Sequence, residues 1–153
     1  MRLRRVLVLA AATGRIGYVY FVDGQPTHWG LTHKGASSPL LAAAQTAKWI
    51  SLFVPEVVIT EQVGERSRKG ALTKYLIAAM ADEARGSGCF VVSVPRVQVY
   101  ANKYDEASQL VRRFPMLSAW LPKRPRIWQS EPRNMVLFEA VALALSFIDG
   151  EGV

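Results

Sequence analysis

The feature that most constrains the fold is a run of seven apolar residues near the N-terminus, VLVLAAA at positions 6–12. Such a run is typical of a central strand that is buried on both faces of a sheet. Thr13-Gly14-Arg15 predicts a tight turn, and the aromatic and β-branched residues 16–22 predict a second strand. Asp23-Gly24 is a two-residue hairpin signal before a third strand at 26–33. The sequence therefore predicts three antiparallel strands joined by short turns.

Basic residues ahead of this apolar run also resemble the start of a secretory signal. We interpret the segment as a strand, because a strand pattern resumes directly after the turn. No apolar stretch reaches the roughly 18 uncharged residues that a membrane span needs. We therefore expect one domain over residues 1–150, located in the cytoplasm, with no membrane partner.

Helices and strands alternate along the rest of the chain. Ser37-Ser38-Pro39 is a serine cap with proline in the first turn, which predicts the start of a helix. The pattern predicts helices at 37–53, 71–85, 104–114 and 132–148, strands at 56–61 and 89–94, and a loop at 115–130. This order predicts an α/β fold with a five-stranded mixed sheet and helices on both faces.

The chain carries 19 basic and 12 acidic residues, a formal charge of +7. This balance favours an anionic partner, and nucleic acid is the commonest one. A solvated basic surface is the alternative. The single cysteine, Cys89, lies in an apolar segment and is interpreted as a core thiol, and the sequence has no His/Cys spacing of the zinc-binding kind.

Three acidic residues stand out. Glu61 closes the apolar strand Val57-Val58-Ile59-Thr60, at the sheet edge where ligands bind in open α/β folds. Glu139 is embedded in an apolar, alanine-rich helix, where an unpaired carboxylate would be costly. Glu131 lies just ahead of that helix. It is either a negative charge that the helix dipole favours at the N-terminus or a third ligand for a metal ion. The alternative to a functional role is, for Glu61, an ordinary acid at the edge of a loop. For Glu139 it is an acid on the solvent-facing side of the helix.

The first strand with Gly17-Tyr18, the strand that ends in Glu61, and Phe138-Glu139-Ala140 resemble the RuvC family of Holliday-junction resolvases. Residues 103–114 look like that family's lysine-bearing helix. The resemblance implies a ribonuclease-H-like fold, a homodimer and a DNA partner, with branched DNA as the target and no small-molecule substrate. It also implies catalytic carboxylates that hold Mg²⁺ or Mn²⁺, carried here by Glu61, Glu139 and Glu131.

Two acids that the resemblance calls for are missing. The aspartate of the first strand would fall near Ala11, within Ala10-Ala11-Ala12, and no acid occurs between residues 1 and 22. Val136 occupies the second position, one turn before Glu139. Two-metal cleavage of a phosphodiester depends on such carboxylates, so their loss is expected to be costly for catalysis.

Basic residues cluster close to these acids in the sequence. Those predicted to bind DNA are Arg66, Arg68, Lys69, Lys74, Lys103, Lys123, Arg124, Arg126 and Arg133. Trp120 and Trp128 are interleaved with them, a pattern that suits phosphate contact with base stacking. The alternative is a solvated loop whose tryptophans pack on the core.

Two main hypotheses follow. The first is a DNA-binding protein on a nuclease scaffold with a degenerate metal site. The second is an active metal-dependent endonuclease that uses Glu61, Glu131 and Glu139. A nucleotide-binding domain of the actin and sugar-kinase type shares this element order, but the sequence has neither its glycine-rich phosphate loops nor a second domain.

Overall fold

The computed structural model describes residues 5–65, 67–97 and 99–150. At its centre lies a five-stranded sheet in the order β3-β2-β1-β4-β5. The strands are β1 (Arg5–Ala12), β2 (Arg15–Val22), β3 (Gln25–Thr32), β4 (Val57–Gln62) and β5 (Phe90–Pro95). β1, β2 and β3 pair antiparallel, whereas β4 pairs parallel with both β1 and β5. The predicted mixed sheet is confirmed.

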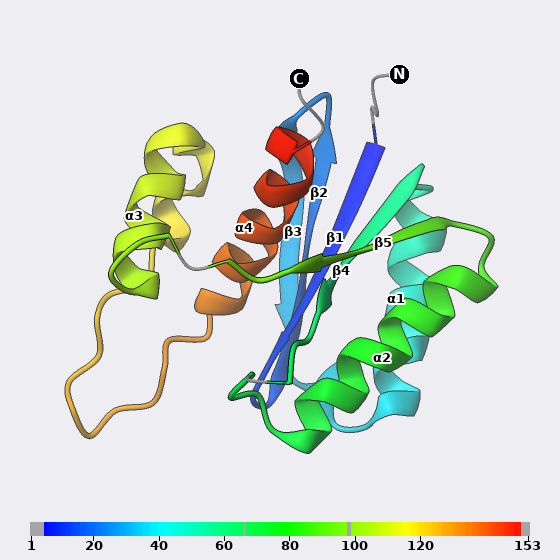
Figure 1. Ribbon diagram of the computed structural model, residues 1–153, viewed down its shortest axis with the longest axis horizontal. Coiled ribbons are helices and arrows are strands. Elements are labelled where there is room, and N and C mark those ends of the chain that lie inside the picture. The colour runs from blue at the N-terminus through cyan, green and yellow to red at the C-terminus, as the bar shows by residue number, and fades with distance from the viewer. Residues whose placement is uncertain (1–4, 66, 98, 151–153) are drawn as a thin grey trace.

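Helices cover both faces of this sheet (Figure 1), as predicted. They are α1 (Pro39–Phe53), α2 (Ala71–Gly86), α3 (Lys103–Arg113) and α4 (Met135–Gly150), with short 3-10 helices η1 (Lys34–Ala36) and η2 (Pro115–Trp120). The helices α1 and α2 pack on one face, and α3 and α4 lie on the other. Over the described ranges, no helix is long and apolar enough to cross a membrane.

The two faces of β1 contribute to different cores, which explains its uninterrupted apolar sequence. Val6, Val8, Ala10 and Ala12 belong to the core beneath α3 and α4. Leu7, Leu9 and Ala11 belong to the core beneath α1 and α2. Successive side chains of a strand point to opposite faces, so a strand covered on both sides has no position for a polar residue. The segment is thus a central strand, as predicted.

A glycine in β2 lets α4 approach the sheet closely. A Cβ atom at Gly17 would lie 3.0 Å from Val136 Cγ1 and 3.2 Å from the Gly30 carbonyl oxygen. Val136 is fully buried at this contact, and Ala140 and Ala144 continue the buried face of the helix. The position that the resemblance assigned to an acid is therefore filled by a core side chain.

Two predictions about the C-terminal third were wrong. The last helix begins at Met135, not at Pro132, because the Pro132 carbonyl accepts an i+3 hydrogen bond from Met135 N in a turn ahead of the helix. The predicted loop at 115–130 contains η2, whose Leu117 is buried. Prolines indicated a break in regular structure, but they also fit the first turn of a short helix.

Candidate functional site

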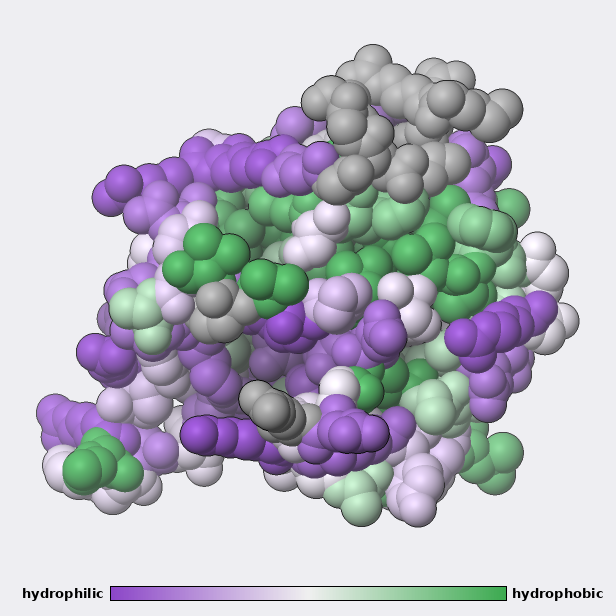
Figure 2. All heavy atoms as spheres, viewed as in Figure 1, coloured by the Kyte–Doolittle hydropathy of each residue, from purple (hydrophilic) through white to green (hydrophobic). Residues whose placement is uncertain are grey.

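The ends of the parallel strands β1, β4 and β5 lie at the same edge of the sheet, and a cleft opens there. Its volume is about 1000 Å³, and its lining is drawn from the segments after β1, β4 and β5 together with α4. The charged residues that line it are Glu61, Arg68, Lys69, Arg96, Lys103, Glu131 and Glu139. Hydrophilic residues occupy the middle of the face drawn in Figure 2, between the projecting loop at its lower left and the helices α1 and α2. All three predicted acids therefore border one cleft.

Glu61 is held at this edge by the alternation of β4. Val57 and Ile59 face the core beneath α4, and Glu61 continues that side of the strand. The residue is 8% exposed, and burial is the main reason why the pKa of its carboxyl is raised. The positive charge of Lys69 lowers that pKa, and the neighbouring Glu139 raises it again. A loop-edge acid in open solvent would have neither the burial nor these neighbours.

Glu139 reaches the same place from the first half of α4. Its side chain is 13% exposed, and its Oε2 atom lies 3.3 Å from Lys69 Nζ. The solvent-facing alternative for this residue is therefore wrong. Packing of α4 close to β2, allowed by Gly17, brings the backbone of Glu139 near the sheet edge.

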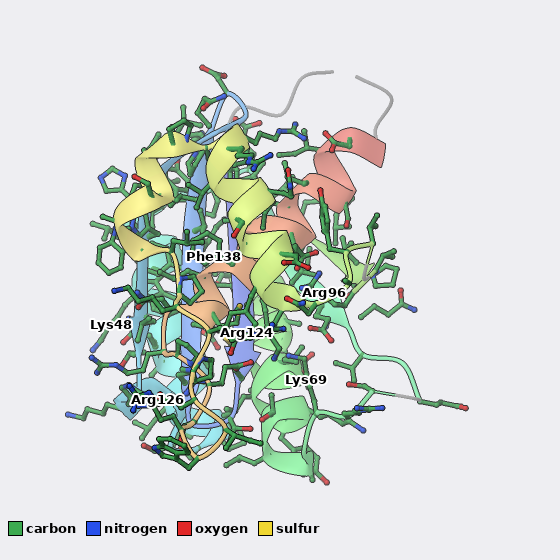
Figure 3. The ribbon with its side chains drawn as sticks, turned by 90° about the vertical axis from the view of Figure 1, so that its left-hand side faces the viewer. Lys48, Lys69, Arg96, Arg124, Arg126 and Phe138 are labelled. Atoms are coloured by element: carbon green, nitrogen blue, oxygen red, sulfur yellow. The ribbon has the colours of Figure 1, made fainter. Side chains whose placement is uncertain are left out.

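Lys69 lies between the two acids, although it was predicted to bind DNA. Its Nζ atom donates to the Ala11 carbonyl oxygen at 2.8 Å and to Glu139 Oε2 at 3.3 Å, and it lies 3.5 Å from Glu61 Oε1. The side chain is 19% exposed. Figure 3 shows it on the segment ahead of α2. The sequence provided no signal for this placement, because Lys69 is one of several basic residues in an irregular loop.

Glu131 lies at the opposite side of the cleft with cationic partners of its own. Its Oε2 atom accepts a hydrogen bond from Arg15 at 3.2 Å, and its Oε1 atom is paired with Lys103. Among the residues that the structure describes, no three His, Cys, Asp or Glu side chains are grouped so that they could hold a metal ion. Glu131 is thus not brought together with Glu61 and Glu139 in such a group.

The position proposed for the missing strand-one acid requires correction. Ala11 is 1% exposed and packs beneath α1 and α2, on the face of the sheet away from α4. Ala12 points to the α4 face and lines the cleft, and Ala10 points to the same face. The predicted position was therefore wrong by one residue. In a strand, a shift of one residue moves a side chain to the opposite face of the sheet.

Arg96 is a cleft residue that the sequence reasoning missed. It follows β5 directly and donates to Glu106 of α3, at 3.1 Å from Nη1 to Oε2 and through a second, shorter contact from Nη2. Burial alone would lower the pKa of Arg96, but Glu106, Glu139 and Glu61 together raise it. The signal was present, because a basic residue at the end of a parallel strand lies at the same edge as Glu61.

Four of the basic residues predicted to bind DNA form a second, exposed group ahead of α4. Lys123, Arg124, Arg126 and Arg133 are exposed, and the segment that carries most of them projects from the body of the protein (Figure 1). Figure 3 shows Arg124 and Arg126 on this segment. The Arg124 guanidinium lies 5.6 Å from the centre of the Tyr104 ring, and that of Arg126 lies 5.6 Å from the centre of the Trp128 ring. Trp128 is 74% exposed and Trp120 is 40% exposed, so neither is a core residue.

The other predicted DNA contacts are distributed around the cleft. Arg68 is exposed on its rim, and Lys103 is exposed but paired with Glu131. Lys74 is half-buried in the first turn of α2. Arg66 lies outside the described residues.

Comparison with known proteins shows which solved structures share this fold. No family model and no curated protein matches the sequence. Among solved structures, Thermus thermophilus RuvC is 18% identical with a TM-score of 0.64, covering 97% of this chain and 96% of that one. The chain has the ribonuclease-H-like fold of RuvC-type Holliday junction resolvases.

Three further structures support the same fold. Fowlpox virus resolvase, solved with Holliday junction DNA, is 12% identical with a TM-score of 0.66, covering 96% of this chain and 98% of that one. The yeast mitochondrial Holliday junction resolvase Ydc2 is 13% identical with a TM-score of 0.66, covering 98% of this chain and 81% of that one. A structure of Thermus thermophilus RuvC with its Holliday junction substrate also matches, at 16% identity and a TM-score of 0.61.

Proposed function

We propose that this protein binds branched or structured DNA on a nuclease scaffold and does not cleave it. The observation that carries the proposal is a set of exposed cationic side chains on the rim of one cleft of a junction-resolvase fold and on the adjoining segment ahead of α4. Arg68 lies on the rim, whereas Arg96 and Lys103 in the cleft are paired with Glu106 and Glu131. The exposed cations of the adjoining segment are Lys123, Arg124, Arg126 and Arg133. Phosphate neutralisation by lysine and arginine supplies much of the affinity of proteins for DNA.

The arrangement of the acidic residues in the cleft supports the proposal that the protein does not cleave DNA. Two-metal catalysis needs several oxygen ligands around a pair of hard ions. β1 contributes only an alanine, Ala12, to the lining of this cleft, and Val136 is a core residue. Glu131 is engaged by Arg15 and Lys103. Only Glu61 and Glu139, among the three predicted acids, share a partner, and that partner is a lysine. The residues present do not fit a pair of divalent ions.

A binding and cleavage assay tests both halves of the proposal. A fluorescent four-way junction and a duplex of the same sequence are titrated with protein in EDTA, then incubated with protein in Mg²⁺ or Mn²⁺. We expect tighter binding to the junction, binding that persists in EDTA, and no cleavage. Metal-dependent cleavage that Glu61→Gln abolishes would establish the active endonuclease instead, and absence of DNA binding would overturn the nucleic-acid function.

Matched variants locate the DNA surface. Arg124→Ala/Arg126→Ala removes two exposed charges from the projecting segment, and we expect weaker junction binding. Lys48→Ala/Arg85→Ala is the control, because it also removes two exposed charges. Lys48 lies in α1, and Arg85 lies in the last turn of α2, roughly 18 Å along the helix axis from its first turn at the cleft. Equal losses in both would show that net charge, and not this surface, governs binding.

We also propose that the protein acts as a homodimer, since the two-fold symmetry of a four-way junction relates its strands in pairs and so offers equivalent strands to two copies. Light scattering at several protein concentrations, with and without a junction, measures the mass of the species. A monomer under all of these conditions would contradict the proposal.

A further inference from the structure

We infer that Lys69 is a built-in counter-ion that takes the place of a divalent metal between Glu61 and Glu139. The inference rests on the proposed loss of metal-dependent cleavage, but it concerns the carboxylate pair alone and is tested without DNA. Its basis is the position of a single ammonium group among oxygens that come from β1, β4 and α4.

The three oxygens match what an ammonium group can bind. Lys69 Nζ lies 2.8 Å from the Ala11 carbonyl oxygen, 3.3 Å from Glu139 Oε2 and 3.5 Å from Glu61 Oε1. An ammonium group has three N–H donors and no acceptor, so two carboxylates and a carbonyl suit it. A hard divalent cation would seek the same oxygens at about 2.0–2.1 Å, so the two cations compete for one place.

The negative charge at this end of the cleft is already partly offset. Lys69 offsets one of the two acids, and Arg96, although bound to Glu106, adds a positive field that acts on both Glu61 and Glu139. A divalent ion placed beside Lys69 would meet a like charge within about 4 Å, in a partly buried site where such repulsion is strong. Metal binding therefore requires that Lys69 leave.

The loop that carries Lys69 is built to hold it there. Lys69 N donates to Ser67 Oγ at 3.2 Å, and Ser67 N donates to the Gly64 carbonyl oxygen at 3.1 Å. The residue thus ties the connection between β4 and α2 to β1 and α4. Its ammonium is engaged within the protein, whereas the neighbouring Arg68 remains exposed to contact phosphate.

Mn²⁺ titration followed by electron paramagnetic resonance tests the inference. We expect no saturable Mn²⁺ binding by the wild-type protein below about 1 mM, and a gain of at least about tenfold in affinity for Lys69→Ala. The double variant Lys69→Ala/Glu61→Gln should lose this gain. Lys48→Ala, which removes an exposed lysine from α1, is the matched control and should behave as the wild-type protein.

Thermal denaturation provides a second readout of the same site. Mn²⁺ should raise the melting temperature of Lys69→Ala and leave that of the wild-type protein unchanged, because a ligand stabilises only the state that binds it. Lys69→Met, which keeps the length of the side chain without its charge, replaces Lys69→Ala if the latter does not fold.

Two results would overturn the inference. One is saturable Mn²⁺ binding by the wild-type protein that Glu139→Gln abolishes, since a metal would then displace Lys69 or coexist with it. The other is a folded Lys69→Ala or Lys69→Met that acquires no affinity for Mn²⁺. If neither variant folds, Mn²⁺ binding and reductive methylation are measured on the wild-type protein. No Mn²⁺ binding together with a Lys69 that is protected from methylation supports the inference. A Lys69 that is readily methylated contradicts it.

Discussion

The orientation of three consecutive alanines in β1 decides which of them could carry a carboxylate. Ala11 packs among apolar side chains beneath α1 and α2, whereas Ala12 lines the cleft. An aspartate at position 11 would bury a charge with no partner on that face. An aspartate at position 12 would face the cleft that Lys69 also lines.

We therefore predict opposite outcomes for two adjacent substitutions. Ala11→Asp should lower the free energy of unfolding by about 3–5 kcal/mol, the cost of an unpaired buried charge. Ala12→Asp should lower it by less than about 2 kcal/mol, because the carboxylate reaches the cleft. Urea denaturation of both variants measures the difference. A larger loss for Ala12→Asp would show that the register of β1 is wrong.

Burial of Glu61 predicts a pH dependence of stability. The pKa of Glu61 in the folded protein is raised above its ordinary value of 4.5, mainly by burial. The folded state then holds this proton more tightly than the unfolded chain, so the contribution of Glu61 to stability falls as pH rises from 4.5 through the raised pKa and is level above it.

The comparison of wild-type protein with Glu61→Gln isolates this contribution. The unfolding free energy of the variant, minus that of the wild-type protein, should increase with pH across this window, because glutamine does not titrate. Denaturation curves from pH 4 to pH 8 measure it. A difference that falls with rising pH would mean that Lys69 stabilises the charged form by more than burial destabilises it.

At the scale of elements, periodicity and turn signals were sufficient for most of the fold. The apolar run of β1 and the Asp23-Gly24 turn predicted the meander, and the edge rule for parallel strands predicted that Glu61 would border a site. The start of α4 was not predicted, because Pro132 suits a helix's first turn and a preceding turn equally well. The site around Lys69 was also not predictable, since an irregular loop has no period from which a side-chain direction can be read.

The segment between η2 and α4 carries an exposed aromatic side chain next to basic ones. This combination predicts that the aromatic ring stacks on a DNA base. Trp128 is 74% exposed beside Arg126, and its neighbour Ile127 is 98% exposed. Trp128→Ala should weaken junction binding by about 1–3 kcal/mol, the range for one stacked base, and change the unfolding free energy by less than about 0.5 kcal/mol. Fluorescence anisotropy with a labelled junction measures the affinity.

Ile127→Ala is the matched control for this prediction. Ile127 lies on the same segment and is more exposed than Trp128, but it has no ring. Its removal should cost less than the removal of Trp128. Equal losses would mean that the segment contributes apolar contact and not base stacking.

At the scale of the whole molecule, folding divides the basic residues into two groups with different surroundings. Cations in the cleft are largely engaged: Lys69 by Glu61 and Glu139, and Lys103 by Glu131. The cations on the projecting segment are exposed to solvent. Two of them, Arg124 and Arg126, contact aromatic rings. The formal charge of +7 predicted an anionic partner, but not this division.

The division predicts which residues govern the salt dependence of DNA binding. Each phosphate contact contributes about 0.9 to the slope of log affinity against log salt concentration, because contact releases condensed counter-ions. Arg124→Ala/Arg126→Ala should therefore reduce the slope by about 1–2. Lys103→Ala should reduce it by less, because Glu131 already neutralises that lysine. Junction binding measured between 50 and 300 mM salt tests both variants, and a greater reduction for Lys103→Ala would mean that DNA phosphate displaces Glu131 from this lysine.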